Sequence, residues 1–125
     1  MVIDAGIFIE HLRAKNKFAT TLYHLSDYEN LFISAVSLYE LYMGATMEAK
    51  KTDVQHITED LFVLPFTEDV AQMAAQIYHQ LKSKNQLIEF RDIFIAATCI
   101  VNNLPIATLN TKHFVRVDGL LFSEL

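Results

Sequence analysis

The chain has 125 residues, 52% of them hydrophobic, with ten Lys and Arg against fifteen Asp and Glu and a formal net charge of −5. This is the length of one ordinary domain, so we expect a single domain over residues 1–125, with a core large enough to fold without a disulfide. The charge balance lacks the overall basic excess of many nucleic-acid-binding proteins, although acidic residues gathered in a cleft would leave a local basic rim intact.

Two features of the sequence indicate the compartment. Asp4 and Glu10 stand where a signal peptide carries basic residues, and the nine-residue apolar run IFIAATCIV at 93–101 is shorter than the ~20 residues that span a bilayer. The one cysteine, Cys99, lies in that run and reads as a small buried thiol. We therefore expect a cytoplasmic protein with no membrane segment.

Short apolar runs typical of strands alternate with longer segments of helical periodicity. The predicted strands are MVID (1–4), NLFIS (30–34), LFVLPF (61–66), PIATL (105–109) and GLLF (119–122). The helical faces predicted between them are Ile7, Phe8 and Leu12, then Phe18, Leu22 and Leu25, then Val70, Ala74, Ile77 and Leu81 in a long helix capped by Thr67. Such alternation predicts an α/β fold, in which a mainly parallel sheet carries helices on both faces.

Asp4 is the first candidate site residue. It ends the first predicted strand, and in open α/β sheets ligands bind just beyond the carboxyl ends of the strands. Taken alone, Asp4 is equally explained as the cap of a helix that starts near Gly6.

Glu40 and Asp92 are two further candidate acids, Glu40 about one helical turn after the second predicted strand and Asp92 at the start of a predicted helix. Glu40 stands three residues after Ser37, the spacing of a capping box in which the glutamate binds the serine N–H. Asp92 begins an almost wholly apolar helix, where a first-turn acid faces the positive helix end and Glu89 and Arg91 read as solvated neighbours. Each acid therefore has a local structural explanation as well as a functional one.

Thr108, at the end of the strand PIATL, and Asn110, just past it, complete the set, although a tight turn also explains Asn110. Three acids and an Asn fall at one sheet edge, where the three carboxylates repel one another unless they bind a hard cation, and Mg²⁺ or Mn²⁺ prefers such oxygen ligands. The five histidines show no HxxxH spacing, and there is no CxxC, which argues against zinc. The chemistry indicated is phosphoryl transfer.

The order Asp4, then SAVSLYELYMGA with Glu40, then LIEFRDIFIAATCIVNNLPIATLNTKHF with Asp92 and Asn110 resembles the PIN-domain family, specifically the VapC-type toxins of toxin–antitoxin pairs. The most specific part is 87–114, where D-x-F-I-A-A-T precedes L-P-x-A-T-L-N-x-x-H-F. The resemblance implies a three-layer α/β/α sandwich with a sheet of four to five strands.

The resemblance also implies a Mg²⁺- or Mn²⁺-dependent ribonuclease. In it Asp4, Glu40 and Asp92 match the acidic metal-binding and catalytic positions, and Thr108 and Asn110 match the supporting ones. The implied partners are the RNA substrate, an antitoxin whose C-terminal segment lies in an apolar groove, and a second copy of the toxin in a homodimer. The residues considered for that groove are Phe8, Phe18, Tyr23, Tyr39 and Tyr42, with core packing as the default for the two phenylalanines.

Two departures from the family pattern weaken the expected activity. Ala5 and Gly6 stand where the family commonly has Ser or Thr and then Asn, and Asn110 stands where it often has Asp. One alternative is therefore an inactive PIN scaffold that binds a partner or RNA without cleavage. A second alternative is a phosphatase with an aspartyl nucleophile, but that mechanism requires a second acid two residues after Asp4, where the chain has Gly6. Lys112 and Arg116 are candidate RNA-backbone contacts, with a solvated surface role as the alternative.

Overall fold

A four-stranded sheet, in which every pair of neighbouring strands is parallel, forms the centre of the protein. The computed structural model describes residues 1–28 and 30–125. The strands are β1 (Val2–Ile3), β2 (Phe32–Ser34), β3 (Phe62–Leu64) and β4 (Ile106–Ala107), in the order β3-β2-β1-β4. The predicted fifth strand at 119–122 contributes a single β-bridge, between Phe122 and Ile106. The sheet therefore has four strands, at the lower end of the four to five expected.

Helices connect the strands as parallel pairing requires. They are α1 (Ala5–Arg13), the 3-10 helix η1 (Lys17–Ala19), α2 (Thr21–Leu25), α3 (Ala35–Gly44), α4 (Glu48–Thr58), α5 (Glu68–Ser83), α6 (Phe90–Val101) and α7 (Thr111–Phe114).

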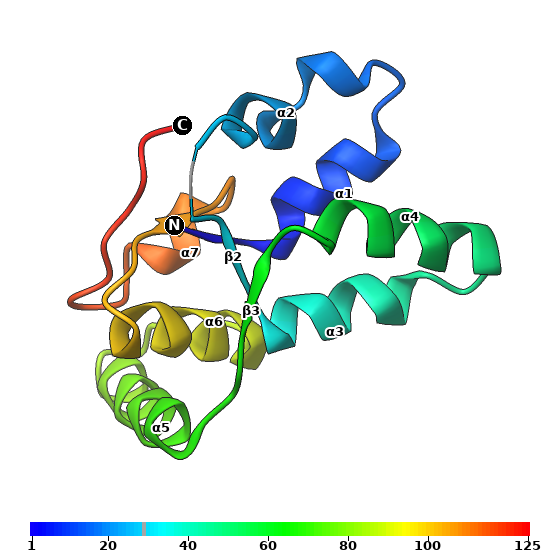
Figure 1. The fold of residues 1–125 in the computed structure, drawn as a ribbon. Coiled ribbons are helices and arrows are strands. Elements are labelled where there is room, and N and C mark those ends of the chain that lie inside the picture. The colour runs from blue at the N-terminus through cyan, green and yellow to red at the C-terminus, as the bar shows by residue number, and fades with distance from the viewer. Residues whose placement is uncertain (29) are drawn as a thin grey trace.

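The two faces of the sheet carry separate cores, because successive side chains of a strand point to opposite faces. Val2 belongs to the core under α5 and α6, whereas Ile3 belongs to the core under α1, α2 and α4. Figure 1 shows α5 and α6 side by side on one side of the strands and α1 and α4 on the other. The predicted three-layer α/β/α sandwich is confirmed.

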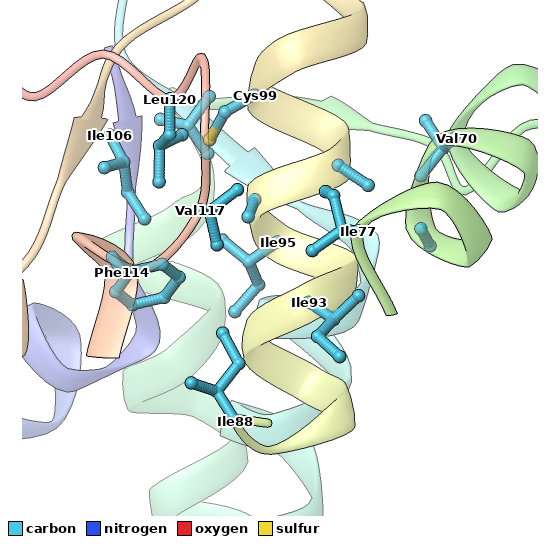
Figure 2. Packing of buried hydrophobic residues seen from close by; sticks show 14 of the residues in the cluster. Val70, Ile77, Ile88, Ile93, Ile95, Cys99, Ile106, Phe114, Val117 and Leu120 are labelled. Carbon is cyan, nitrogen blue, oxygen red and sulfur yellow. The ribbon is translucent and has the colours of Figure 1, made fainter. Parts of the chain in front are cut away.

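Helix α6 is the centre of the first core (Figure 2). Ile93 and Ile95 are at most 1% exposed, and Cys99 is fully buried beside them. Burial raises the pKa of the Cys99 thiol to about 12, with the nearby Asp4 adding to the effect. The reading of Cys99 as a small buried hydrophobe is therefore confirmed.

The long helix α5 also follows its prediction. Thr67 caps it by accepting the N–H of Val70, and the predicted stripe of Val70, Ala74, Ile77 and Leu81 is buried. The predicted face of Phe18, Leu22 and Leu25 is wrong at Phe18. Phe18 lies in η1 rather than in α2, and it is 70% exposed there instead of buried.

No helix within residues 1–28 and 30–125 is long and apolar enough to cross a membrane.

Candidate active site

Asp4 lies at the carboxyl end of β1 and makes two fixed hydrogen bonds. Its Oδ1 accepts the N–H of Ala5 at 2.9 Å, and its Oδ2 accepts the hydroxyl of Thr108 at 2.8 Å. Asp4 therefore caps α1, which starts at Ala5, and also reaches the end of β4. The helix cap and the position at the sheet edge are compatible roles of one carboxylate.

Burial raises the pKa of the Asp4 carboxyl. The hydroxyl of Thr108 opposes this shift, the charge of Asp92 adds to it, and the N–H of Ala5 again opposes it. Because Ala5 and Gly6 offer no polar side chain, the backbone N–H of Ala5 and the side chain of Thr108 supply the hydrogen bonds to Asp4. Thr108 is itself buried and also accepts the N–H of Asn110 at 2.9 Å.

Glu40 is not part of a capping box, so that interpretation of the sequence is wrong. Strand β2 ends at Ser34, which is the N-cap of α3 and accepts the N–H of Ser37 at 3.0 Å. Glu40 therefore lies in the second turn of the helix, beyond reach of the capping position. Two serines three residues apart made the later one look like the cap.

The carboxylate of Glu40 instead accepts a hydrogen bond from Arg91. The Arg91 Nη1 lies 3.2 Å from Glu40 Oε2, and the two side chains are 50% and 16% exposed. Burial raises the pKa of Glu40, Arg91 opposes the rise, and the charges of Asp4 and Asp92 add to it. Arg91 is half exposed, as expected of a solvated neighbour, but it also pairs with Glu40, which was not expected.

Asp92 lies in the first turn of α6, as predicted, with its side chain 18% exposed. Burial raises its pKa, and His113, whose Nδ1 is 3.6 Å from Asp92 Oδ2, opposes the rise. This places the carboxylate where α6 meets α7.

His113 and Arg91 are the two site residues that sequence reasoning missed. The Nδ1 of His113 is also 3.1 Å from the Nδ2 of Asn110, so the ring lies between Asn110 and Asp92. The signal for His113 was its place three residues after Asn110 in L-N-x-x-H-F, which puts both on one helical turn. No local pattern could have paired Arg91 with Glu40, because the two are 51 residues apart.

The donor atoms at this edge suit a hard divalent cation in their chemistry. Asp4, Glu40 and Asp92 offer only oxygens. The charge of Asp92 raises the pKa of Asp4, and the charges of both raise the pKa of Glu40, shifts that an added cation would oppose. In the described part of the chain, no three His, Cys, Asp or Glu side chains are already grouped so that they could hold a metal ion. The carboxylates therefore interact electrostatically without forming a ready-made ligand cluster.

Two clefts lie near this edge of the sheet. One, of about 280 Å³, lies between α1, α3 and α4 and is lined by Glu40 together with Arg13, Lys50 and Asp53. The other, of about 450 Å³, is lined by His113 and by residues 87–90, which lead into α6, and by none of the three carboxylates.

Comparison with known proteins identifies the family. Residues 1–120 match the PIN domain. A ribonuclease VapC from Rickettsia bellii is 32% identical over an alignment of 127 positions, which covers 96% of this chain and 92% of the relative. The toxin FitB from Neisseria gonorrhoeae is 30% identical over an alignment of 134 positions, which covers 98% of this chain and 96% of the relative. This chain belongs to the PIN-domain family, and its resemblance to the VapC-type members is confirmed.

The solved structures agree on the fold. A chain of VapBC2 from Rickettsia felis, solved with a DNA fragment from its promoter, superposes with a TM-score of 0.86 over 99% of this chain and 97% of that one. Its sequence identity is 20%, so this likeness concerns the architecture alone.

Proposed function

We propose that this protein is a divalent-metal-dependent endoribonuclease and the toxin of a toxin–antitoxin pair. One observation carries the proposal: three acids, from the end of β1, from α3 and from the first turn of α6, lie near enough at one edge of the sheet that the charge of Asp92 raises the pKa of Asp4 and the charges of both raise the pKa of Glu40. Relatives of nearly the same length, one named a ribonuclease and one a toxin, support the activity and the role.

Each carboxylate has a separate part in the proposed hydrolysis. Asp4 and Asp92 would hold Mg²⁺ or Mn²⁺, directly or through water, and Glu40 orients the attacking water or takes its proton. The cation, when bound, supplies positive charge that stabilises the charge developing on the phosphate. Thr108 fixes the Asp4 carboxylate by its 2.8 Å hydrogen bond, and Asn110 supports Thr108 from the other side.

The basic residues nearest the site suggest how RNA is held. Arg13 and Lys50 line the same cleft as Glu40, where they offer positive charge to the phosphate backbone despite the acidic net charge. Arg116 is a weaker candidate, because its guanidinium donates to the backbone carbonyls of Gln86 and Leu87 and so holds that loop. Lys112 is exposed and stays a candidate contact.

An antitoxin and a second toxin copy stay proposals drawn from the family. Of the aromatic residues considered for an antitoxin groove, Phe8 is fully buried in the core, the default expected of the phenylalanines, and so cannot line a groove. Phe18, Tyr23, Tyr39 and Tyr42 are exposed, and the rings of Phe18 and Tyr23 meet edge to face at 5.2 Å. The mass of the purified chain in solution tests the homodimer.

Metal-dependent RNA cleavage tests the proposed function. Purified wild-type chain and an Asp92→Asn variant, prepared identically, are incubated with total RNA in Mn²⁺, Mg²⁺ or EDTA, and the new RNA ends are sequenced. We expect cuts at defined sites by the wild type with metal, and none with EDTA or by Asp92→Asn.

Two outcomes would contradict the proposal. Equal cleavage by both proteins would assign the activity to a contaminant. Absence of cleavage together with a melting temperature that no divalent cation moves would favour the scaffold alternative.

A further inference from the structure

The ion pair between Arg91 and Glu40 joins α6 to α3 across the site edge. Half-exposed ion pairs contribute little to stability, because water screens them and ordering long side chains costs entropy. Stability alone therefore gives a weak reason for a guanidinium at this point, one residue before Asp92.

The partners of the other two acids differ from Arg91 in kind. Asp4 is held by a backbone N–H and by the Thr108 hydroxyl, and Asp92 lies beside the imidazole of His113. Arg91 carries a permanent charge, because the guanidinium is not deprotonated in proteins. Among the salt bridges of the described residues, it is the one that places such a cation on one of the three acids.

Arg91 already lies 3.2 Å from one oxygen of the Glu40 carboxylate, so a divalent cation that binds this carboxylate, directly or through water, must share it with the guanidinium. The two positive charges would then repel each other at short range. The two cations are therefore expected to exclude each other at Glu40.

We propose that Arg91 is an internal competitor of the metal ion: it holds the Glu40 carboxylate while the site is empty of divalent cation and releases it when the cation binds. This inference rests on the proposed metal-dependent function and adds a positioning residue to it. Arg91 lowers the metal affinity of the site, keeps Glu40 oriented toward α6, and leaves a free guanidinium beside Asp92 after the exchange.

Affinity for Mn²⁺ is the first test, measured by calorimetry on the full chain. Arg91→Gln removes the competitor and is expected to bind Mn²⁺ about threefold to tenfold more tightly than wild type. Arg13→Gln is the matched control, because Arg13 lines the same cleft as Glu40 but forms no salt bridge with Glu40. Its affinity should stay within about twofold of wild type.

The outcomes separate this inference from the function on which it rests. Equal tightening by both variants would show a diffuse field effect and overturn the competition. Unchanged or weaker binding by Arg91→Gln, with measurable binding by wild type, would overturn the role of Arg91 and leave the metal site intact. Absence of binding by wild type and Arg91→Gln alike would overturn both.

The Nε–H signal of Arg91 in a nitrogen-15 NMR spectrum is the second test, assigned by its loss in Arg91→Gln. The Glu40→Gln variant gives the position of the signal when no carboxylate holds the guanidinium. We expect saturating Mg²⁺ to move the wild-type signal toward that position. A signal that stays in place while Mg²⁺ raises the melting temperature would contradict the exchange.

Discussion

Asp4 and Glu40 are both acids at the same edge of the sheet, yet the fold holds them in opposite ways. Asp4 is 8% exposed, and its two oxygens each accept a hydrogen bond from a neutral donor that belongs to the framework. Glu40 reaches from the middle of a helix to a half-exposed arginine on another helix.

The difference indicates which acid is fixed and which is exchangeable. Moving Asp4 would leave the buried hydroxyl of Thr108 and the first N–H of α1 without their acceptor, and such losses are costly. Moving Glu40 breaks one screened ion pair, whose loss costs little. We therefore expect Asp4 to be a rigid ligand and Glu40 to be the acid that rearranges during binding and catalysis.

The largest expected effect is the loss of activity in Asp4→Asn. The amide oxygen can still accept the N–H of Ala5, so the fold is kept, but the negative charge is gone. Even changes beyond the direct ligands cost 10–100-fold in metal affinity, so losing this carboxylate should lower cleavage by about 100-fold or more. The measurement is the initial rate of RNA cleavage at saturating Mn²⁺. A rate near that of wild type would remove Asp4 from the site.

Metal binding should stabilise the folded chain by the next largest amount. An ion that binds only the folded state contributes RT ln(1 + [L]/Kd), or about 2.7 kcal/mol at a hundredfold excess over Kd. Thermal unfolding in the presence of Mg²⁺ or Mn²⁺ measures this effect, and a sodium salt at the same concentration is the control. Asp4→Asn should lose most of the increase in melting temperature. An equal increase in wild type and variant would place the ion elsewhere.

Asp4→Ala should be less stable than Asp4→Asn by about 1 kcal/mol, because the amide oxygen of Asn can still accept the N–H of Ala5 and only Ala removes this helix cap. The hydroxyl of Thr108 loses its carboxylate acceptor in both variants, so that loss does not enter the difference between them. Urea unfolding without metal measures the difference. Equal stability of the two variants would mean that the hydrogen bond from Ala5 does not anchor Asp4.

The same contrast explains what the sequence could predict. Asp4, Asp92 and Thr108 follow strands or begin a helix, so topology alone brought them to one edge. Thr67 and the stripe of α5 were predictable for a similar local reason, because a cap and a helical period lie within a few residues of each other.

What the sequence could not predict depends on distant partners or on a shift of one helical turn. The pair of Arg91 with Glu40 joins different helices, and the contact of His113 with Asp92 joins α7 to α6. The capping-box reading of Glu40 failed because α3 starts at Ala35, whereas Ser37 as the cap would place the start three residues later, at Leu38. Phe18 was misplaced because a short 3-10 helix interrupts the helical period.

Asp92→Asn should be as stable as wild type or slightly more stable at neutral pH without metal, within about 1 kcal/mol. Burial raises the pKa of Asp92 in the folded chain, so ionising it costs stability as the pH rises above its unfolded value. Any gain of the variant should therefore appear as the pH rises and vanish in acid, where both side chains are neutral. A variant clearly less stable at pH 7 would show that the contact of Asp92 with His113 outweighs burial.

The smallest expected effect is the stability difference between Glu40→Gln and Glu40→Ala. A capping box would make Ala the less stable of the two, but Ser34 is the cap and Glu40 lies within the helix. Both variants lose one half-exposed ion pair, and Ala has the higher helix propensity, so their free energies of unfolding should agree within about 0.5 kcal/mol. Both should lose cleavage by about 10²–10⁴-fold, since neither can take a proton from water. If Glu40→Gln cleaved RNA at the wild-type rate, Asp4 and Asp92 would remain as the only catalytic acids. If Glu40→Ala were markedly less stable than Glu40→Gln, Glu40 would have a structural role. The single half-exposed ion pair that holds Glu40, in contrast to the two hydrogen bonds that fix Asp4, argues against such a role.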